Sequence, residues 1–87
     1  ALVVEVSESS LVFDRGHKGS VYARADIPDY WIVNLVDRVL EVYREPALDA
    51  AAPFGARYAS REVLGPSRLV SPLAAPQASI RVRDLFA

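Results

Sequence analysis

An acid and a lysine near the start of the chain have types and spacing that could do chemistry. Glu5 lies within the apolar run LVVEV, residues 2–6. Burying an ionised carboxylate is costly unless the group is paired, hydrogen-bonded or bound to a metal. Carboxylate oxygens suit Mg²⁺ and Mn²⁺, so one interpretation of Glu5 is a divalent-metal ligand. The other is an edge strand, or the carboxyl end of a strand, where water reaches the side chain.

Lys18 follows Glu5 across a single strand-to-helix connection. If the helix packs back along the sheet, the ammonium can reach the Glu5 carboxylate or a phosphate beside it. The alternatives are a solvated helix lysine or an ion pair with Asp14. Asp14, Lys18 and Tyr22 are spaced four residues apart, which places them along one helix face. Asp14 alone is interpreted as a partner of Lys18, or as an acid that the helix dipole favours, rather than as a metal ligand.

Other routes to catalysis find little support in the sequence. His17 is the only histidine and lies on a different helical face from Lys18, so we expect it to be exposed and not catalytic. No serine and histidine spacing suggests a nucleophilic triad. Gly16 and Gly19 fall inside the predicted helix rather than in a strand-to-helix loop, so they do not form a phosphate loop. The lack of cysteine excludes disulfides and thiolate metal sites.

The elements that must position these side chains come from the hydrophobic pattern. We predict a strand over residues 2–6, a helix over 11–25 and strands over 30–35 and 39–44. Ser9 or Ser10 is placed to cap the helix through its hydroxyl. A helical crossover makes the first two strands parallel, and the short link at 36–38 makes the next pair an antiparallel hairpin. The fold class is therefore α/β (α+β), with a mixed β-sheet and a helical crossover.

The second half of the chain has a weaker pattern. Residues 45–55 are predicted as a loop, 57–64 as a strand, 68–71 and 78–82 as short strands, and 84–86 as a last helical turn. Tyr30 and Trp31 are interpreted as core aromatics. The 87 residues form a single domain, residues 1–87, with room for only a modest core.

Composition narrows the class of partner. The net charge of −1 argues against strong non-specific binding to nucleic acid, although it allows a local basic patch. No apolar run approaches the roughly 20 residues that cross a bilayer, and no leader pattern opens the chain. We therefore expect no membrane partner and a cytoplasmic location. A strand that begins at Ala1, with no Met and no lead-in, predicts an incomplete N-terminus.

Several spaced motifs resemble a known family. They are an apolar strand ending in EVS, the pattern D-x-x-x-K-x-x-x-Y beginning at Asp14, the segment IPDYWIV at residues 27–33, and V-x-D-L-F at residues 82–86. Together they resemble the Uma-two family of restriction endonucleases, within the PD-(D/E)XK nuclease superfamily. The similarity is strong over residues 1–45 and weaker over 69–86.

The resemblance implies a restriction-endonuclease-like fold and a mechanism. In the superfamily, acids bind Mg²⁺ (or Mn²⁺), the metal activates a water that attacks a DNA phosphodiester, and a lysine positions groups or stabilises charge. Carried over by position, Glu5 is the motif acid and metal ligand. Ser7 stands where the superfamily motif has its lysine, and Lys18 on the following helix corresponds to that lysine.

The family pattern also has an acid upstream of the first strand, which this sequence does not contain. We therefore interpret residues 1–87 as the C-terminal part of a restriction-endonuclease-like domain. Two hypotheses follow. One is a Mg²⁺-dependent endonuclease with DNA as its partner. The other is a non-catalytic structural or dimerisation module derived from such a nuclease, for which a homodimer is left open.

Overall fold

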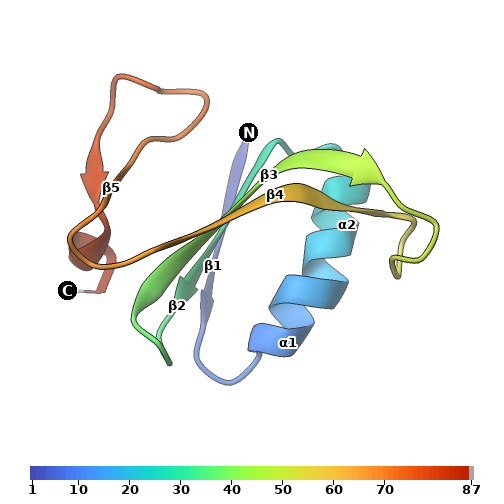
Figure 1. Ribbon diagram of the computed structural model, residues 1–87, viewed down its shortest axis with the longest axis horizontal. Helices are drawn as coiled ribbons and strands as arrows, with labels where there is room; N and C mark the ends of the chain where they lie inside the picture. The colour runs from blue at the N-terminus through green and yellow to red at the C-terminus, as the bar shows by residue number, and fades with distance from the viewer. Residues whose placement is uncertain (87) are drawn as a thin grey trace.

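The computed structural model describes residues 1–86 and has one mixed sheet between a helix and a C-terminal segment (Figure 1). The strand order of the sheet is β1-β2-β3-β4. A second, two-stranded sheet and a 3-10 helix follow it. The bounds are β1 (Leu2–Ser7), β2 (Asp29–Asn34), β3 (Val39–Leu48), β4 (Ala56–Leu64), β5 (Leu69–Val70), β6 (Ile80–Arg81) and the 3-10 helix Val82–Phe86.

The strand directions agree with the sequence-based topology. β1 pairs with β2 in parallel, and Glu5 lies opposite Ile32. β2 pairs with β3 in antiparallel fashion through a tight turn, in which Arg38 has φ 55°. All six residues of β2 are buried, because it is an inner strand covered on both faces. The predicted mixed α/β (α+β) sheet with a helical crossover is confirmed, and it is consistent with a restriction-endonuclease-like fold.

The crossover is one continuous helical segment with a widened turn in its middle. It consists of α1 (Leu11–Phe13), a π-helical turn (Asp14–Lys18) and α2 (Gly19–Arg24). Single π turns within helices are frequent at functional sites. At the end of α2 the Ile27 N–H donates to the Tyr22 carbonyl, and Asp26 has the left-handed φ of 62°. This Schellman-type ending stops the helix at Arg24, four residues before Pro28.

Two local predictions are wrong. β3 continues through residues 45–48, which the sequence predicted as loop. Beyond Arg44 the strand has only β4 beside it, so Pro46 lies where a missing N–H costs no bond to β2. Ser10 is the residue before α1, but its side chain makes no capping hydrogen bond to the backbone. Its hydroxyl donates instead to the Asp14 carboxylate.

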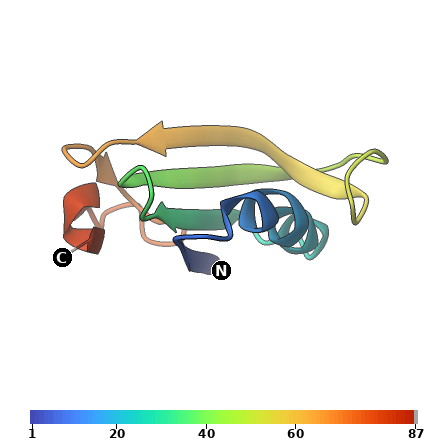
Figure 2. The same cartoon turned by 90° about the horizontal axis from the view of Figure 1, so that it is seen from below.

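Alternating residues of the inner strands point to opposite faces of the sheet and pack into two separate hydrophobic cores. Tyr30 and Ile32 pack under the helix, whereas Trp31 and Val33 point to the opposite face. Both aromatic residues are buried in the core, as predicted. The C-terminal segment covers the opposite face through Val70 and Val82. Figure 2 shows the four strands side by side, with the helix against the sheet at one end and the 3-10 helix at the other.

A buried carboxylate ties the C-terminal segment to the sheet. Asp29 accepts hydrogen bonds from Trp31 Nε1 at 2.7 Å, from Arg44 Nε at 2.9 Å and from the Leu73 backbone N–H at 2.9 Å. Arg44 also donates to the Ser71 carbonyl at 2.7 Å. Because these bonds satisfy the buried acid, the irregular segment after β5 has a defined place on the sheet.

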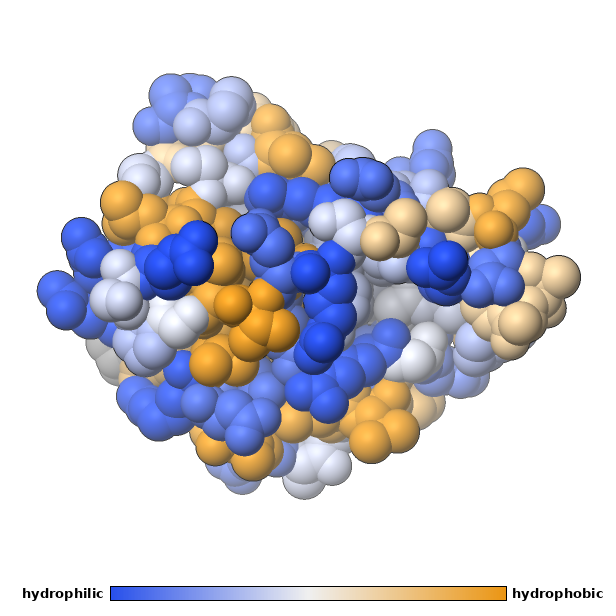
Figure 3. Space-filling model, in the orientation of Figure 1, coloured by the Kyte–Doolittle hydropathy of each residue, from blue (hydrophilic) through white to orange (hydrophobic). Residues whose placement is uncertain are grey.

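The molecular surface is mixed in hydropathy. In the face shown in Figure 3, apolar side chains reach the surface between hydrophilic ones. The most exposed large hydrophobic residues belong to different elements and include Val6, Val12 and Leu48. Among residues 1–86, no helix has both the length and the hydrophobicity needed to cross a membrane.

A second buried acid fixes the helix on the sheet. Glu41, in β3, is 1% exposed and accepts a two-pronged hydrogen bond from the Arg15 guanidinium, with Nε 2.9 Å from Oε1. Asn34 and Tyr43 donate to the same carboxylate at 3.0 and 2.7 Å. Burial raises the pKa of Glu41, but these hydrogen bonds outweigh burial and hold the pKa at about 2. Glu41 is therefore ionised near neutral pH.

Replacing Arg15 by Ala should lower the free energy of unfolding by about 3 kcal/mol. The change removes the guanidinium that is hydrogen-bonded to the buried Glu41 carboxylate, whereas Asn34 and Tyr43 still donate to it and Arg61 stays at 3.8 Å. Urea denaturation measures the loss, and the exposed Arg68→Ala serves as the control. Equal losses in the two variants would show that the Arg15 contact does not hold the helix.

The low pKa of Glu41 also predicts how stability depends on pH. Its folded-state pKa of about 2 lies below the ordinary 4.5, so its contribution is present above pH 4.5 and is lost as the pH falls toward 2. Glu41→Gln cannot titrate, so the stability difference between wild type and this variant should shrink as the pH falls through that window. Urea unfolding at several pH values measures the difference. A difference that stays constant would contradict the prediction.

Candidate functional site

Glu5 and Lys18 meet where β1 runs beside the helix, together with Asp14. The Lys18 ammonium lies 3.3 Å from Glu5 Oε1 and 3.4 Å from Asp14 Oδ1. The sequence left open whether Lys18 reaches Glu5, pairs with Asp14 or is solvated. The structure places the ammonium between the two carboxylates, with 36% of the lysine side chain exposed.

Two hydroxyl groups set the orientation of the carboxylates. The Tyr22 hydroxyl donates to Glu5 Oε2 at 2.7 Å, and the Ser10 hydroxyl donates to Asp14 Oδ2 at 2.9 Å. Each carboxylate therefore has one oxygen bound by a hydroxyl and the other facing Lys18. Glu5 Oε1, from the first strand, and Asp14 Oδ1, from the helix, therefore both lie next to the Lys18 ammonium.

Glu5 belongs to a strand at the edge of the described sheet. Its side chain is 24% exposed, so it is reached by water and is only partly desolvated. This is the edge-strand setting that the sequence allowed for. Partial exposure leaves the carboxylate accessible to a ligand, and Lys18 and Tyr22 compensate for the part of it that is buried.

Asp14 is the buried acid of the group. It is 1% exposed, and its backbone carbonyl accepts a hydrogen bond from the Tyr30 hydroxyl at 2.9 Å. Within residues 1–86, Oδ1 is the buried side-chain atom that has no hydrogen-bond partner, since the nearby ammonium is within ion-pair distance but not in hydrogen-bonding geometry. An orphaned buried oxygen is rare and calls for a physical explanation.

The sequence missed part of this arrangement. The four-residue spacing identified the shared face of Asp14, Lys18 and Tyr22, and their contacts confirm it. The burial of Asp14 depends on the π turn and on Tyr30, and no pattern in the sequence indicated it. Ser10 was noticed only as a capping residue.

The carboxylates of Glu5 and Asp14 shift the pKa values of Lys18 and Tyr22. Partial burial lowers the pKa of Lys18, but the attraction of the Glu5 and Asp14 carboxylates, each within ion-pair distance, raises it overall. The hydrogen bond to Glu5 and then burial raise the pKa of the Tyr22 hydroxyl. Near neutral pH the lysine is a cation and the tyrosine a hydroxyl donor, so both keep their contacts with Glu5.

The oxygen donors suit a hard divalent cation. In the part of the chain that the structure describes, no group of three or more His, Cys, Asp or Glu side chains could hold a metal ion. Mg²⁺, however, is usually bound through one or two carboxylates together with water and substrate phosphate. Glu5 Oε1 and the orphaned Asp14 Oδ1 face the same point, and an oxygen pair of this kind fits that preference.

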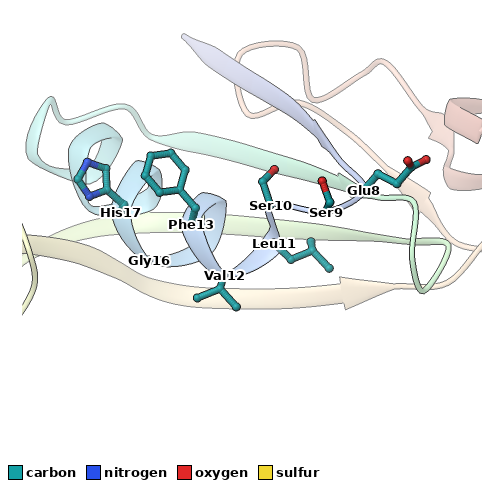
Figure 4. Close-up of a pocket in the computed structure, with 8 residues that line it drawn as sticks. All are labelled: Glu8, Ser9, Ser10, Leu11, Val12, Phe13, Gly16 and His17. Carbon is teal, nitrogen blue, oxygen red and sulfur yellow. The ribbon is translucent and has the colours of Figure 1, made fainter.

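An open hollow of about 670 Å³ lies at the start of the helix and is lined by residues 8–13 together with Gly16 and His17 (Figure 4). Ser10 lines the hollow and also contacts Asp14, and the Phe13 ring lies 5.9 Å from the Lys18 ammonium. His17 is exposed, as predicted, and its ring stacks on Phe13 at 4.7 Å. The hollow therefore adjoins the site through Ser10, whereas Glu5, Asp14 and Lys18 are not among its lining residues.

Comparison with known proteins identifies one related family. The model of the Uma2 (Uma-two) family, described as putative restriction endonuclease, matches residues 1–83. No curated protein matches the chain. No solved structure matches it either.

Replacing Tyr22 by Phe should lower the free energy of unfolding by about 1 kcal/mol, the usual net value of a hydrogen bond. The variant removes only the hydroxyl that donates to Glu5. A double-mutant cycle with Glu5→Gln, followed by chemical denaturation, isolates the pair. If the two substitutions add without coupling, the hydroxyl does not hold the Glu5 carboxylate in solution.

Proposed function

We propose, since the chain belongs to the Uma2 family of putative restriction endonucleases, that the protein is a divalent-metal-dependent endonuclease hydrolysing DNA phosphodiester bonds. The observation that carries the proposal is the convergence of two carboxylate oxygens on the Lys18 ammonium at an accessible edge of the sheet. This arrangement brings metal-binding and phosphate-binding chemistry into one place.

Glu5 is proposed as the metal ligand of this site. Mg²⁺ or Mn²⁺, when bound, would supply a coordinated water of lowered pKa and positive charge next to the phosphate. The Tyr22 hydroxyl fixes one oxygen of Glu5, so the other oxygen keeps its direction. A ligand that is oriented before binding gives up less side-chain entropy when the metal arrives.

Lys18 is proposed as the charge-stabilising lysine. Its pKa is raised by its acidic neighbours, so it stays protonated near neutral pH. The side chain is 36% exposed and flexible, and its ammonium can donate to a phosphate oxygen on which negative charge develops. Phe13 and His17 line the open hollow at the start of the same helix.

The second candidate function is a non-catalytic dimerisation module derived from such a nuclease. One observation favours it. β1 lies at the edge of the described sheet, and Val4 and Val6 on this strand are 46% and 64% exposed. An edge strand with exposed valines is a surface on which another strand can pair.

Nuclease activity can be tested with supercoiled plasmid, Mn²⁺ and the full-length protein. We expect nicking by the wild type and a loss of rate of at least about a hundredfold in Glu5→Gln and in Lys18→Ala, because each removes a group that contacts the metal or the transition-state charge. Glu62→Gln, at an exposed acid on β4, is the matched control and should cut at the wild-type rate.

Two outcomes would contradict the proposal. Cleavage that survives both site substitutions would place the chemistry elsewhere. No cleavage by the full-length wild type, together with a dimer mass in light scattering, would favour the dimerisation module instead.

A further inference from the structure

The strongest unexplained feature of the molecule is the buried, unbonded oxygen of Asp14. Its partner oxygen accepts the Ser10 hydroxyl, yet Oδ1 faces the Lys18 ammonium without a hydrogen bond. Glu5 repeats this arrangement, with one oxygen held by the Tyr22 hydroxyl and the other turned to the same ammonium. The protein therefore presents two oriented carboxylate oxygens to one point in space.

The ammonium is held only loosely at that point. Its contacts of 3.3 and 3.4 Å are longer than the roughly 2.7–2.9 Å of a strong charge-assisted hydrogen bond. A side chain that is 36% exposed and has four methylene groups can swing into solvent at little cost. The two carboxylates and the ammonium have a net charge of −1, which attracts a further cation.

We propose that Asp14 and Glu5 together form a divalent-cation site, and that the cation displaces the Lys18 ammonium from between them. Asp14 thereby becomes a second metal ligand, a role that its position in the sequence did not suggest. The inference rests on the proposed nuclease function and deepens it. The displaced ammonium would then be free to donate a hydrogen bond to a phosphate oxygen beside the metal. Cation binding would therefore make Lys18 available to the substrate.

Replacement of the Lys18 ammonium by a divalent cation explains how one site can hold both a lysine and a metal ion. The two carboxylates have a positively charged neighbour in either state. Before the cation binds, Lys18 offsets one of the two negative charges and so reduces the repulsion between the carboxylates. Afterwards a doubly charged ion, which binds carboxylate oxygens at about 2.0–2.1 Å in the case of Mg²⁺, neutralises them more effectively. No bond other than the metal–oxygen contacts is made, and no proton needs to move.

Cation binding can be measured directly because Lys18 is the only lysine in the sequence. In protein made with isotope-labelled lysine, a single side-chain NMR resonance reports on this ammonium. We expect Mg²⁺ to shift the resonance saturably toward the position of a solvated lysine. A resonance that does not move while Mn²⁺ binding is seen by calorimetry would overturn the displacement.

Variants test each part of the site by calorimetric titration with Mn²⁺. Asp14→Asn should weaken Mn²⁺ binding at least about tenfold, since even the loss of a residue that only orients a metal ligand costs about that much. Lys18→Met should tighten binding, by up to about tenfold, because the competing cation is gone. Glu62→Gln should bind like the wild type. Wild-type affinity in a folded Asp14→Asn protein, or weaker binding by Lys18→Met, would overturn the inference.

The measurements separate this inference from the nuclease proposal. Mn²⁺-dependent cleavage by the wild type, combined with unchanged cation affinity in Asp14→Asn, would reject the role of Asp14 and keep the nuclease. Cation binding that depends on Asp14 and Glu5, without cleavage of any DNA, would keep the site and reject the nuclease.

Discussion

The ion pair between Arg15 and the buried Glu41 is the interaction on which the rest of the structure depends. Glu41 belongs to an inner strand and Arg15 to the helix, so their two-pronged contact fixes one element on the other. The burial of Glu41 is costly unless the guanidinium, Asn34 and Tyr43 compensate for it. This requirement makes the helix position specific, and the neighbouring residue Asp14 is held at the same place.

The functional group is built on that fixed helix. In the π turn, consecutive side chains serve different purposes, since Arg15 anchors the helix to the inner sheet while Asp14 and Lys18 face β1. The edge position of β1 keeps Glu5 within reach of solvent and substrate. A rigid inner sheet and an accessible edge strand thus combine firm positioning with access, as metal-dependent chemistry requires.

The sequence predicted the local elements well where the pattern was strong. The parallel pairing of β1 with β2, the hairpin, the strand predicted over residues 57–64 and the aromatic core all follow from alternation, turn residues and the crossover rule. It failed at the end of β3, because the Ala, Pro and Gly residues of segment 45–55 predicted a loop. Pro46 is tolerated in the strand because β2 does not pair with β3 beyond Arg44. The sequence also failed at Ser10, whose hydroxyl bonds a side chain instead of the backbone.

By itself, the sequence determined the mixed α/β sheet, the family resemblance and the choice of Glu5 and Lys18 as the chemical candidates, since these depend on residue type and short-range spacing. Only the tertiary structure decided that Lys18 lies between Glu5 and Asp14 and that one oxygen of Asp14 is buried without a hydrogen bond. The reason is geometric. Whether oxygens from two separate elements converge depends on the packing of the helix against the sheet, which Arg15, Glu41 and Tyr30 fix through contacts far apart in the chain.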